Sequence, residues 1–304
     1  MLFRFKSWFL FAISLFLVDC GGEWTSSDNS EVYSCDLGDW SGGTPSRLAI
    51  SGDAETLYLL DNYSRVYLYG VNAARKCAYE LDRSVTTDGA ITLSGFADDI
   101  ALAGTFLYYN DGIRIRRYDD DAWSCDVTTH SMTVQPSSMV VAKTAGLEDY
   151  NFNSTGCALQ STPFSGVTRV HSVAANASIV VTAESVTGGS DSPTSISIYD
   201  RLTGSVKYRS ALSANEDSEM HFCSATRLRL GSSYILLLDA KCGYLGVFDY
   251  QGTFVHRLDL ADLGIRSVAD IAVVGDVLYI LNGSTYNTLY KLDFATYSWE
   301  KEIS

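Results

Sequence analysis

The chain contains an internal repeat, and this repeat limits what it can fold into more than any other feature. Residues 99–109, which read DIALAGTFLYY, return without a gap at 270–280 as DIAVVGDVLYI. The two copies lie 171 residues apart, which corresponds to four units of about 43 residues. A period of this length is typical of the blades of a β-propeller.

Each unit reads as four short strands. An apolar strand ends at Gly, a second strand contains Leu-Tyr or its equivalent, a third ends in an aromatic residue or Leu followed by Asp, and a fourth carries an aromatic residue. Four antiparallel strands cannot bury both of their faces alone, whereas radial stacking of such sheets buries the faces and leaves only short edges. We therefore predict an all-β protein, a β-propeller of six blades with four antiparallel strands each, over residues 42–304.

This unit pattern resembles that of six-bladed propellers of the NHL and TolB type. Five or seven blades stay open as alternatives, because the unit between 137 and 166 is short and irregular. The equivalent starts of the inner strands are then expected at Asp99, Ser138, Ser172, Ala225 and Asp270.

An Asp recurs directly after the third strand of the unit. It is found at Asp119, Asp200, Asp249 and Asp293, and Gly follows at Gly204 and Gly252. Asp accepts backbone hydrogen bonds at the start of a tight turn, and Gly supplies the positive φ at its end. These acids are therefore expected to shape turns and to take no part in catalysis.

Residues 1–20 have the pattern of a signal peptide, with Arg4 and Lys6 followed by an apolar stretch too short for a comfortable membrane span. The segment Leu17-Val18-Asp19-Cys20 resembles a bacterial lipobox, which implies a lipid on Cys20 and export to the cell envelope. Asp19 stands where that pattern prefers Gly, Ala or Ser. Ordinary secretory cleavage near Gly21 therefore stays open, as does an uncleaved anchor.

Residues 21–41 are expected to form a tether that includes a possible closing strand. Residues 21–30 are polar, as in a flexible linker. Residues 31–37 resemble 122–127, the fourth strand of its unit, so they are expected to add an outer strand to the last blade. Residues 297–303 read as a competing fourth strand for that blade.

The seven cysteines support export. Without Cys20 six remain, an even number that allows up to three disulfides in an oxidising compartment. Sequence order suggests the pairs Cys35–Cys77, Cys125–Cys157 and Cys223–Cys242, and buried free thiols are the alternative. No CxxC or His-Cys spacing indicates zinc.

The formal net charge of −14, without a cluster of Lys and Arg, makes nucleic acid an improbable partner. The candidates for a metal site in the central channel are the inner-strand acids Asp99 and Asp270, and Asp98 and His171 could also point inward. Two acids are too few for a calcium cage of six to eight oxygens. No cofactor is predicted, and calcium at those two acids is a weak alternative. The acidic run 119–121 reads as a solvated turn, and the insertion 184–194 as a surface loop.

The sequence favours an exported, lipid-anchored β-propeller that acts as a binding or scaffolding protein of the bacterial cell envelope. Its partner, an envelope protein or a small ligand, is not named by any motif. One alternative is a propeller hydrolase or lyase with a metal-dependent site in the central channel. Another is a secreted interaction protein without a lipid. No GxSxG, P-loop, GxGxxG or HExxH motif favours an enzyme.

Overall fold

The computed structural model describes residues 23–25, 31–37, 42–71, 79–81, 90–143, 146–160, 164, 166–167, 169–185, 192–215, 217–283 and 288–294. This part of the chain consists of strands and turns without a helix, so it holds no helix long and apolar enough to cross a membrane. The segment 1–20 with Cys20, and the competing strand at 297–303, lie outside these residues.

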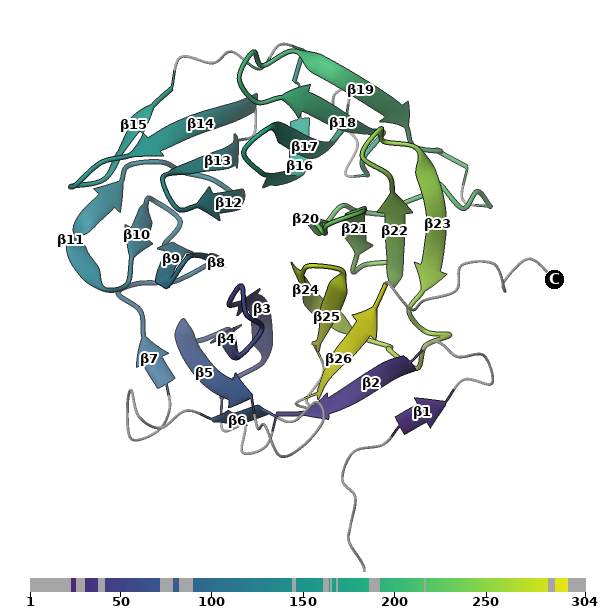
Figure 1. Ribbon diagram of the computed structural model, residues 1–304, viewed down its shortest axis with the longest axis horizontal. Helices are drawn as coiled ribbons and strands as arrows, with labels where there is room; N and C mark the ends of the chain where they lie inside the picture. The colour runs from purple at the N-terminus through teal and green to yellow at the C-terminus, as the bar shows by residue number, and fades with distance from the viewer. Residues whose placement is uncertain are drawn as a thin grey trace, which may run out of the picture.

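Six antiparallel sheets surround a central axis, as Figure 1 shows. The first is β3 (Pro45–Ile50), β4 (Thr56–Asp61), β5 (Arg65–Val71) and β6 (Tyr79–Leu81), with β7 (Ala90–Thr92) also on β5. The second is β8 (Asp99–Ala103), β9 (Phe106–Asn110), β10 (Ile115–Arg117) and β11 (Asp120–Cys125). The third is β12 (Ser131–Gln135), β13 (Ser138–Lys143), β14 (Gly146–Phe152) and β15 (Cys157–Leu159).

The fourth sheet is β16 (Arg169–Ala175), β17 (Ile179–Ser185), β18 (Ser195–Asp200) and β19 (Val206–Ala211). The fifth is β20 (Arg227–Leu230), β21 (Ile235–Asp239), β22 (Tyr244–Phe248) and β23 (Phe254–Asp259). The sixth is β24 (Val268–Val274), β25 (Val277–Asn282), β26 (Thr288–Asp293), β2 (Glu31–Asp36) and β1 (Glu23–Thr25). The all-β, six-bladed architecture expected from the repeat is thus confirmed.

The third blade differs from the sequence expectation in its register. Met139–Ala142, expected as the inner strand of an irregular unit, lie in the second strand β13. The inner strand is β12, which pairs with β13 from Ser131↔Ala142 to Gln135↔Ser138 around a two-residue turn. β12 was missed because it alternates polar and apolar residues and lacks the Gly that follows four of the other five inner strands.

The last blade is completed by the beginning of the chain. β2 pairs antiparallel with β26, from Val32↔Leu292 to Asp36↔Thr288, and β1 pairs with the other edge of β2. Cys35 and Leu37 are fully buried in the core between the sixth and first blades. β2 therefore holds the outer position that β11, which it resembles in sequence, holds in the second blade.

Each neighbouring pair of blades shares one hydrophobic core, which gives six cores for six blades. β21 shows how one strand serves two of them. Leu236 and Leu238 face the sixth blade, whereas Ile235 and Leu237 face the fourth. Successive side chains of a strand point to opposite faces, so a strand covered on both faces is apolar at successive positions, as in the ILLL of residues 235–238.

The glycine of the repeat has a conformational reason. Gly104 and Gly275 both have φ of +63°, a left-handed conformation that side chains with a Cβ rarely adopt. Each begins the two-residue turn between the inner and second strands, where Ala103 pairs with Phe106 and Val274 with Val277. The glycine of the repeat is thus required by the turn that connects the inner strand of a blade to its second strand.

The antiparallel order gives the disc two distinct faces. We name the face at which the inner strands begin the start face, and the face at which they end the end face. Short turns such as 104–105, 201–205 and 249–253 lie on the end face. The connections that follow β17 and β19 begin on the start face, because the second and fourth strands of a blade end there. Of the insertion expected at 184–194, residues 186–191 lie outside the described residues.

Candidate functional site

The centre of the propeller is formed by one residue from each inner strand at the same register position. These residues, which we name the central ring, are Arg47, Asp99, Ser131, Ser172, Arg227 and Asp270. Each is followed by an apolar residue that packs between the blades. The ring therefore contains two guanidinium groups, two carboxylates and two hydroxyls.

Arg227 links Asp99 and Asp270, the two acids at the start of the repeated segments. Its Nη1 and Nη2 donate to Asp99 at 3.0 and 2.6 Å, and its Nε donates to Asp270 at 3.0 Å. All three residues are at most 3% exposed. Burial alone would lower the pKa of Arg227, but Asp99 and Asp270 raise it well above its ordinary value. The centre is therefore held by a buried arginine that is hydrogen-bonded to two buried carboxyl groups.

The ring also ties the blades together through the backbone. Ser131 Oγ accepts the N–H of Val173 at 3.2 Å, Ser172 Oγ accepts that of Leu228 at 2.9 Å, and Asp270 Oδ2 accepts that of Leu48 at 3.0 Å. In each case the acceptor serves the next blade around the ring.

An arginine side chain cannot accept a hydrogen bond, so Arg47 and Arg227 cannot accept a backbone N–H from the next blade. In the blade that follows each of them, the ring acid accepts the N–H of its own successor. Asp99 Oδ1 accepts from Ile100 at 3.0 Å, and Asp270 Oδ1 accepts from Ile271 at 2.8 Å.

The sequence located this ring only in part. Asp99, Ser172 and Asp270 occupy it as expected, but Ser138 and Ala225 do not. Ser138 begins the second strand β13, and Ala225 precedes β20. Arg227 was missed, although Arg227-Leu228-Arg229-Leu230 aligns without a gap on Asp99-Ile100-Ala101-Leu102 and Arg47-Leu48-Ala49-Ile50. Alignment from the end of each inner strand would have revealed it.

The two weak metal candidates, Asp99 and Asp270, are thus brought together, with a guanidinium between them. Calcium there stays the weak alternative that the sequence left open. Among the described residues, one other cluster has the donors of a metal site, Cys223, Asp239 and Cys242, and its two sulfur atoms form a disulfide. In the acidic run 119–121, Asp119 and Asp120 pair with Arg117 at 2.8 Å each.

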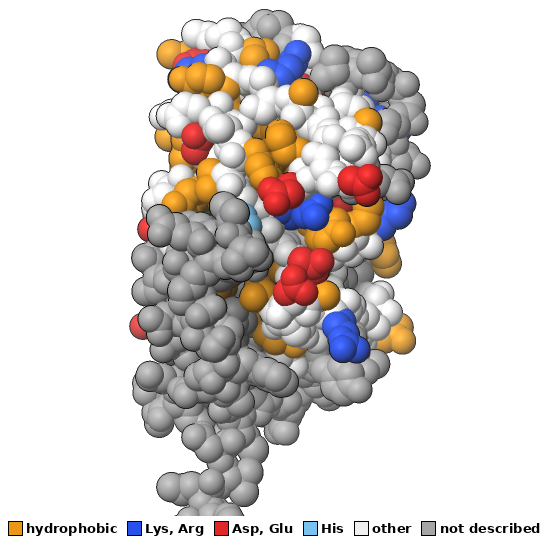
Figure 2. Space-filling model, turned by 90° about the vertical axis from the view of Figure 1, so that its right-hand side faces the viewer, with side chains coloured by type: hydrophobic (Ala, Val, Ile, Leu, Met, Phe, Trp, Pro, Cys, Tyr) orange, Lys and Arg blue, Asp and Glu red, His pale blue; other side chains and the backbone are white. Residues whose placement is uncertain are grey.

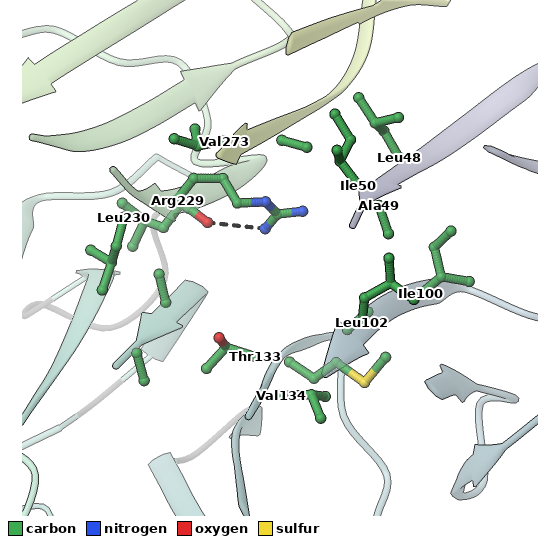
Figure 3. A pocket seen from close by; sticks show the side chains of 16 residues that line it. Leu48, Ala49, Ile50, Ile100, Leu102, Thr133, Val134, Arg229, Leu230 and Val273 are labelled. Atoms are coloured by element: carbon green, nitrogen blue, oxygen red, sulfur yellow. Dashed lines mark hydrogen bonds between the residues drawn. The ribbon is translucent and has the colours of Figure 1, made fainter. Parts of the chain in front are cut away.

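A cavity of about 230 Å³ occupies the channel on the end-face side of the ring. Two positions after the ring, the inner strands present Ala49, Ala101, Thr133, Ala174, Arg229 and Ala272, all of which line it. Four of these six are alanines, and such small side chains leave the space near the axis open. Ile50, Leu102, Val134, Leu230 and Val273 line the next level (Figure 3).

Arg229 is the one charged residue that lines this cavity. In Figure 3 its guanidinium extends from β20 into the opening, between Val273 and Ile50. Its Nε donates to the carbonyl of Ile271 and its Nη1 to that of Leu228, both at 3.0 Å, and Nη2 lies 3.6 Å from Asp270 Oδ1. The side chain is 23% exposed.

Two of the suggested disulfides are present. Cys125–Cys157 joins β11 of the second blade to β15 of the third, with the Cα atoms 5.3 Å apart. Cys223–Cys242 joins the connection 212–226 to the turn after β21, with the Cα atoms 6.0 Å apart. Cys35 is also disulfide-bonded. Cys77 lies outside the described residues, so the Cys35–Cys77 pair stays a prediction.

The start face carries three large apolar side chains on adjoining loops of the first two blades. Tyr63, Phe96 and Ile113 are 67%, 64% and 69% exposed, and we name them the start-face patch. The loops touch, because Ala97 N donates to Ser64 Oγ at 2.8 Å and Gly112 lies against Asp98. On the rim visible in Figure 2, by contrast, hydrophobic, acidic and basic side chains are interspersed.

Comparison with known proteins supports the fold. No family model and no curated protein matches the chain. The β-propeller domain of Cps50 (Swd1) from Myceliophteria thermophila aligns with a TM-score of 0.53 and 8% identity, over 85% of this chain and 99% of that one. BamB from Moraxella catarrhalis aligns with a TM-score of 0.49 and 11% identity, over 88% and 90% of the two chains.

Proposed function

We propose that this protein is a binding module of the bacterial cell envelope, exported, held to a membrane by a lipid on Cys20, and built from blades of the NHL and TolB type. A protein partner docks on the start face. The start-face patch is the observation that carries this proposal, because loops on a rigid scaffold commonly bind, and aromatic side chains are enriched in the cores of interfaces. Two aromatic residues and an isoleucine exposed on adjoining loops fit that role.

The disulfides support the proposed location. Disulfides persist in the periplasm and outside the cell and are rare in the cytosol. Cys125–Cys157 and Cys223–Cys242 lie in different parts of the disc. An oxidising compartment is therefore the natural setting for this chain.

Affinity purification from solubilised envelope membranes tests the docking face. The variant Tyr63→Ser, Phe96→Ser, Ile113→Ser should lose a partner that the unchanged protein retains. A matched control is Leu202→Ser, Val206→Ser, Tyr208→Ser, because these fourth-blade residues are also exposed, at 88%, 39% and 45%. Equal recovery of the partner by both variants would place docking elsewhere.

Two further measurements separate the alternatives. Mass spectrometry of the mature N-terminus should find a lipidated Cys20, and an unmodified start at another residue would favour the secreted protein. Metal analysis distinguishes the hydrolase or lyase. Stoichiometric calcium or zinc that is lost in the variant Asp99→Ala, Asp270→Ala would favour that enzyme over a pure scaffold.

A further inference from the structure

The strand β1 fixes the beginning of the chain to the rim of the sixth blade. Residues 23–25, which belong to the stretch expected as a flexible linker, pair with residues 31–33 of β2. β1 is the outermost strand of its sheet, beyond β26 and β2, and Figure 1 shows it on the outside of the ring. Only residues 21 and 22 therefore stand between Cys20 and a strand of the disc.

This spacing limits the distance between the rim and a lipid on Cys20. Consecutive Cα atoms are 3.80 Å apart across a trans peptide, so the Cα atoms of Cys20 and Glu23 are separated by at most about 11 Å. A lipid on Cys20 lies in the membrane, and the rim of the sixth blade is therefore held close to the membrane surface.

The strand begins between the two faces of the disc. Glu23 pairs with Tyr33, the third of the six residues of β2. Because β1 runs antiparallel to β2, the chain before Glu23 leads toward the start face. Asp36, at the start-face end of β2, lies three residues beyond Tyr33, or about 10 Å along the strand. The reach of the connection is thus used up at the level of the strand ends, before the loops of the start face.

The net charge favours contact through one rim over contact through a whole face. The chain has a formal net charge of −14, and a lipid surface that carries anionic headgroups repels acidic protein surface. A disc that stands on one blade brings less of its surface close to the lipid than a disc that lies flat.

We propose that the rim of the sixth blade faces the membrane and that the disc stands upright on the lipid surface. The proposal rests on the lipid anchor of the proposed function. The third blade, which lies opposite the sixth in a ring of six, is then the farthest from the membrane. Both faces stay open to the aqueous phase, so the start-face patch is accessible to a protein partner.

Förster transfer to a labelled lipid tests this orientation. Lipidated protein from envelope membranes is reconstituted into vesicles of phosphatidylethanolamine and phosphatidylglycerol that contain a rhodamine-labelled lipid. Val255→Cys in the fifth blade and Tyr208→Cys in the fourth provide matched labelling sites, because the replaced side chains are 40% and 45% exposed. Transfer from Val255→Cys should be at least twofold more efficient, because the fifth blade adjoins the sixth. The unchanged protein measures the background labelling.

An insertion of about twelve Gly and Ser residues between Gly22 and Glu23 is the control, because it keeps β1 and lengthens the connection with a flexible linker. The insertion should remove most of the difference between the two sites. Equal transfer from the two sites without the insertion, or more transfer from Tyr208→Cys, would overturn the upright orientation. Mass spectrometry of the same sample is read separately. A mature N-terminus without a lipid would contradict the anchor of the proposed function, and the orientation with it.

Discussion

Arg227 balances the charge at the centre of the molecule. It is 2% exposed and makes three hydrogen bonds to Asp99 and Asp270. Breaking a buried ion pair by removing one partner leaves a charge without compensation, which is far more costly than replacing the whole group by apolar residues. The arginine is therefore the group that compensates the two buried carboxyl groups of the channel.

Arg227→Met should lower the free energy of unfolding at pH 7 by about 3–5 kcal/mol, the range for breaking buried pairs. Arg227 helps to lower the pKa of Asp270, so without the arginine that pKa should rise and the deficit should shrink as the pH falls toward 4. Urea unfolding at several pH values measures this. Arg266→Met is the control, and a deficit that is small or independent of pH would contradict the prediction.

Asp270 predicts a second pH dependence. Burial would raise its pKa, but Arg227, Arg229 and Arg47 together lower it below the ordinary value. Because the unfolded pKa is about 3.9, the stabilisation is complete above about pH 4 and is lost as the pH falls through the folded pKa. Asp270→Asn should therefore be less stable than the unchanged protein at pH 6, with a gap that narrows below pH 4. A constant gap would refute this assignment.

Among the residues of the central ring, the sequence predicts only those that recur in matching segments. Asp99 and Asp270 stand in matching copies, so their shared location could be expected. Arg227 differs chemically from both, and its role depends on facing Asp99 across the channel, 128 residues away in sequence. The period of the repeat identifies equivalent positions in different blades. Which unlike side chains pair across the central axis follows only from the three-dimensional structure.

The outer strands of the second and third blades are joined more closely than a disulfide alone requires. Ser124 and Gly156 form a parallel bridge beside Cys125–Cys157, and Trp123 Nε1 donates to the carbonyl of Asn153 at 3.1 Å. This junction fastens two elements, β11 and β15, that belong to different sheets.

Gly156→Ala should open this junction. A Cβ at Gly156 would overlap the carbonyl oxygen of Ser124, a backbone atom that cannot rotate away. We expect a loss of about 1–3 kcal/mol, as for overpacked cores, measured by urea unfolding. Gly52→Ala is the control, because a Cβ there meets no atom within 4 Å. Equal stability of the two variants would show that the strands separate freely.

Removal of the disulfide itself gives an independent prediction. The variant Cys125→Ala, Cys157→Ala should lose about 2–4 kcal/mol, because the bridge spans 32 residues and restricts the unfolded chain. Hydrogen exchange should show faster opening of β11 and β15 than of the inner strands. Unchanged protection of these two strands would contradict the prediction.

Elements were predictable where local chemistry repeats. The turn after β22 follows the expected pattern, since Asp249 Oδ1 accepts the N–H groups of Gln251 and Thr253, and Gly252 has φ of +78°. The turn after β10 differs, because Asp119 pairs with Arg117 and Asp120 accepts the N–H of Ala122. β12 was not predictable in this way. Its turn uses Pro136 and Ser137, so neither an Asp nor a Gly marks where the strand ends.

The whole molecule is a closed ring with one seam, where β2 meets β26. The period of the repeat favoured six blades, because that number follows from chain length divided by unit length, but the irregular unit between 137 and 166 left five or seven open. The seam depends on a pairing between the two ends of the chain. Only the likeness of residues 31–37 to 122–127 indicated it.

A chain that starts at residue 42 should therefore lose stability. It lacks β2, the buried side chain of Leu37, which corresponds to about 1.5–3 kcal/mol, and Cys35, whose disulfide corresponds to about 2–4 kcal/mol. The exposed edge of β26 should also promote association. Thermal unfolding and sedimentation measure both effects, and a chain that starts at residue 30 is the control. Equal behaviour of the two chains would show that the seam is dispensable.

The seam also sets the order of events during biosynthesis. Val32 and Leu292, which pair in the finished protein, are separated by almost the entire chain. At about 5–20 residues per second, a ribosome takes roughly 13–50 seconds to travel from one to the other. β2 is thus among the first strands to be synthesised and among the last to pair with its neighbour. The segment that forms β2 must therefore avoid pairing with other strands until translation is nearly complete.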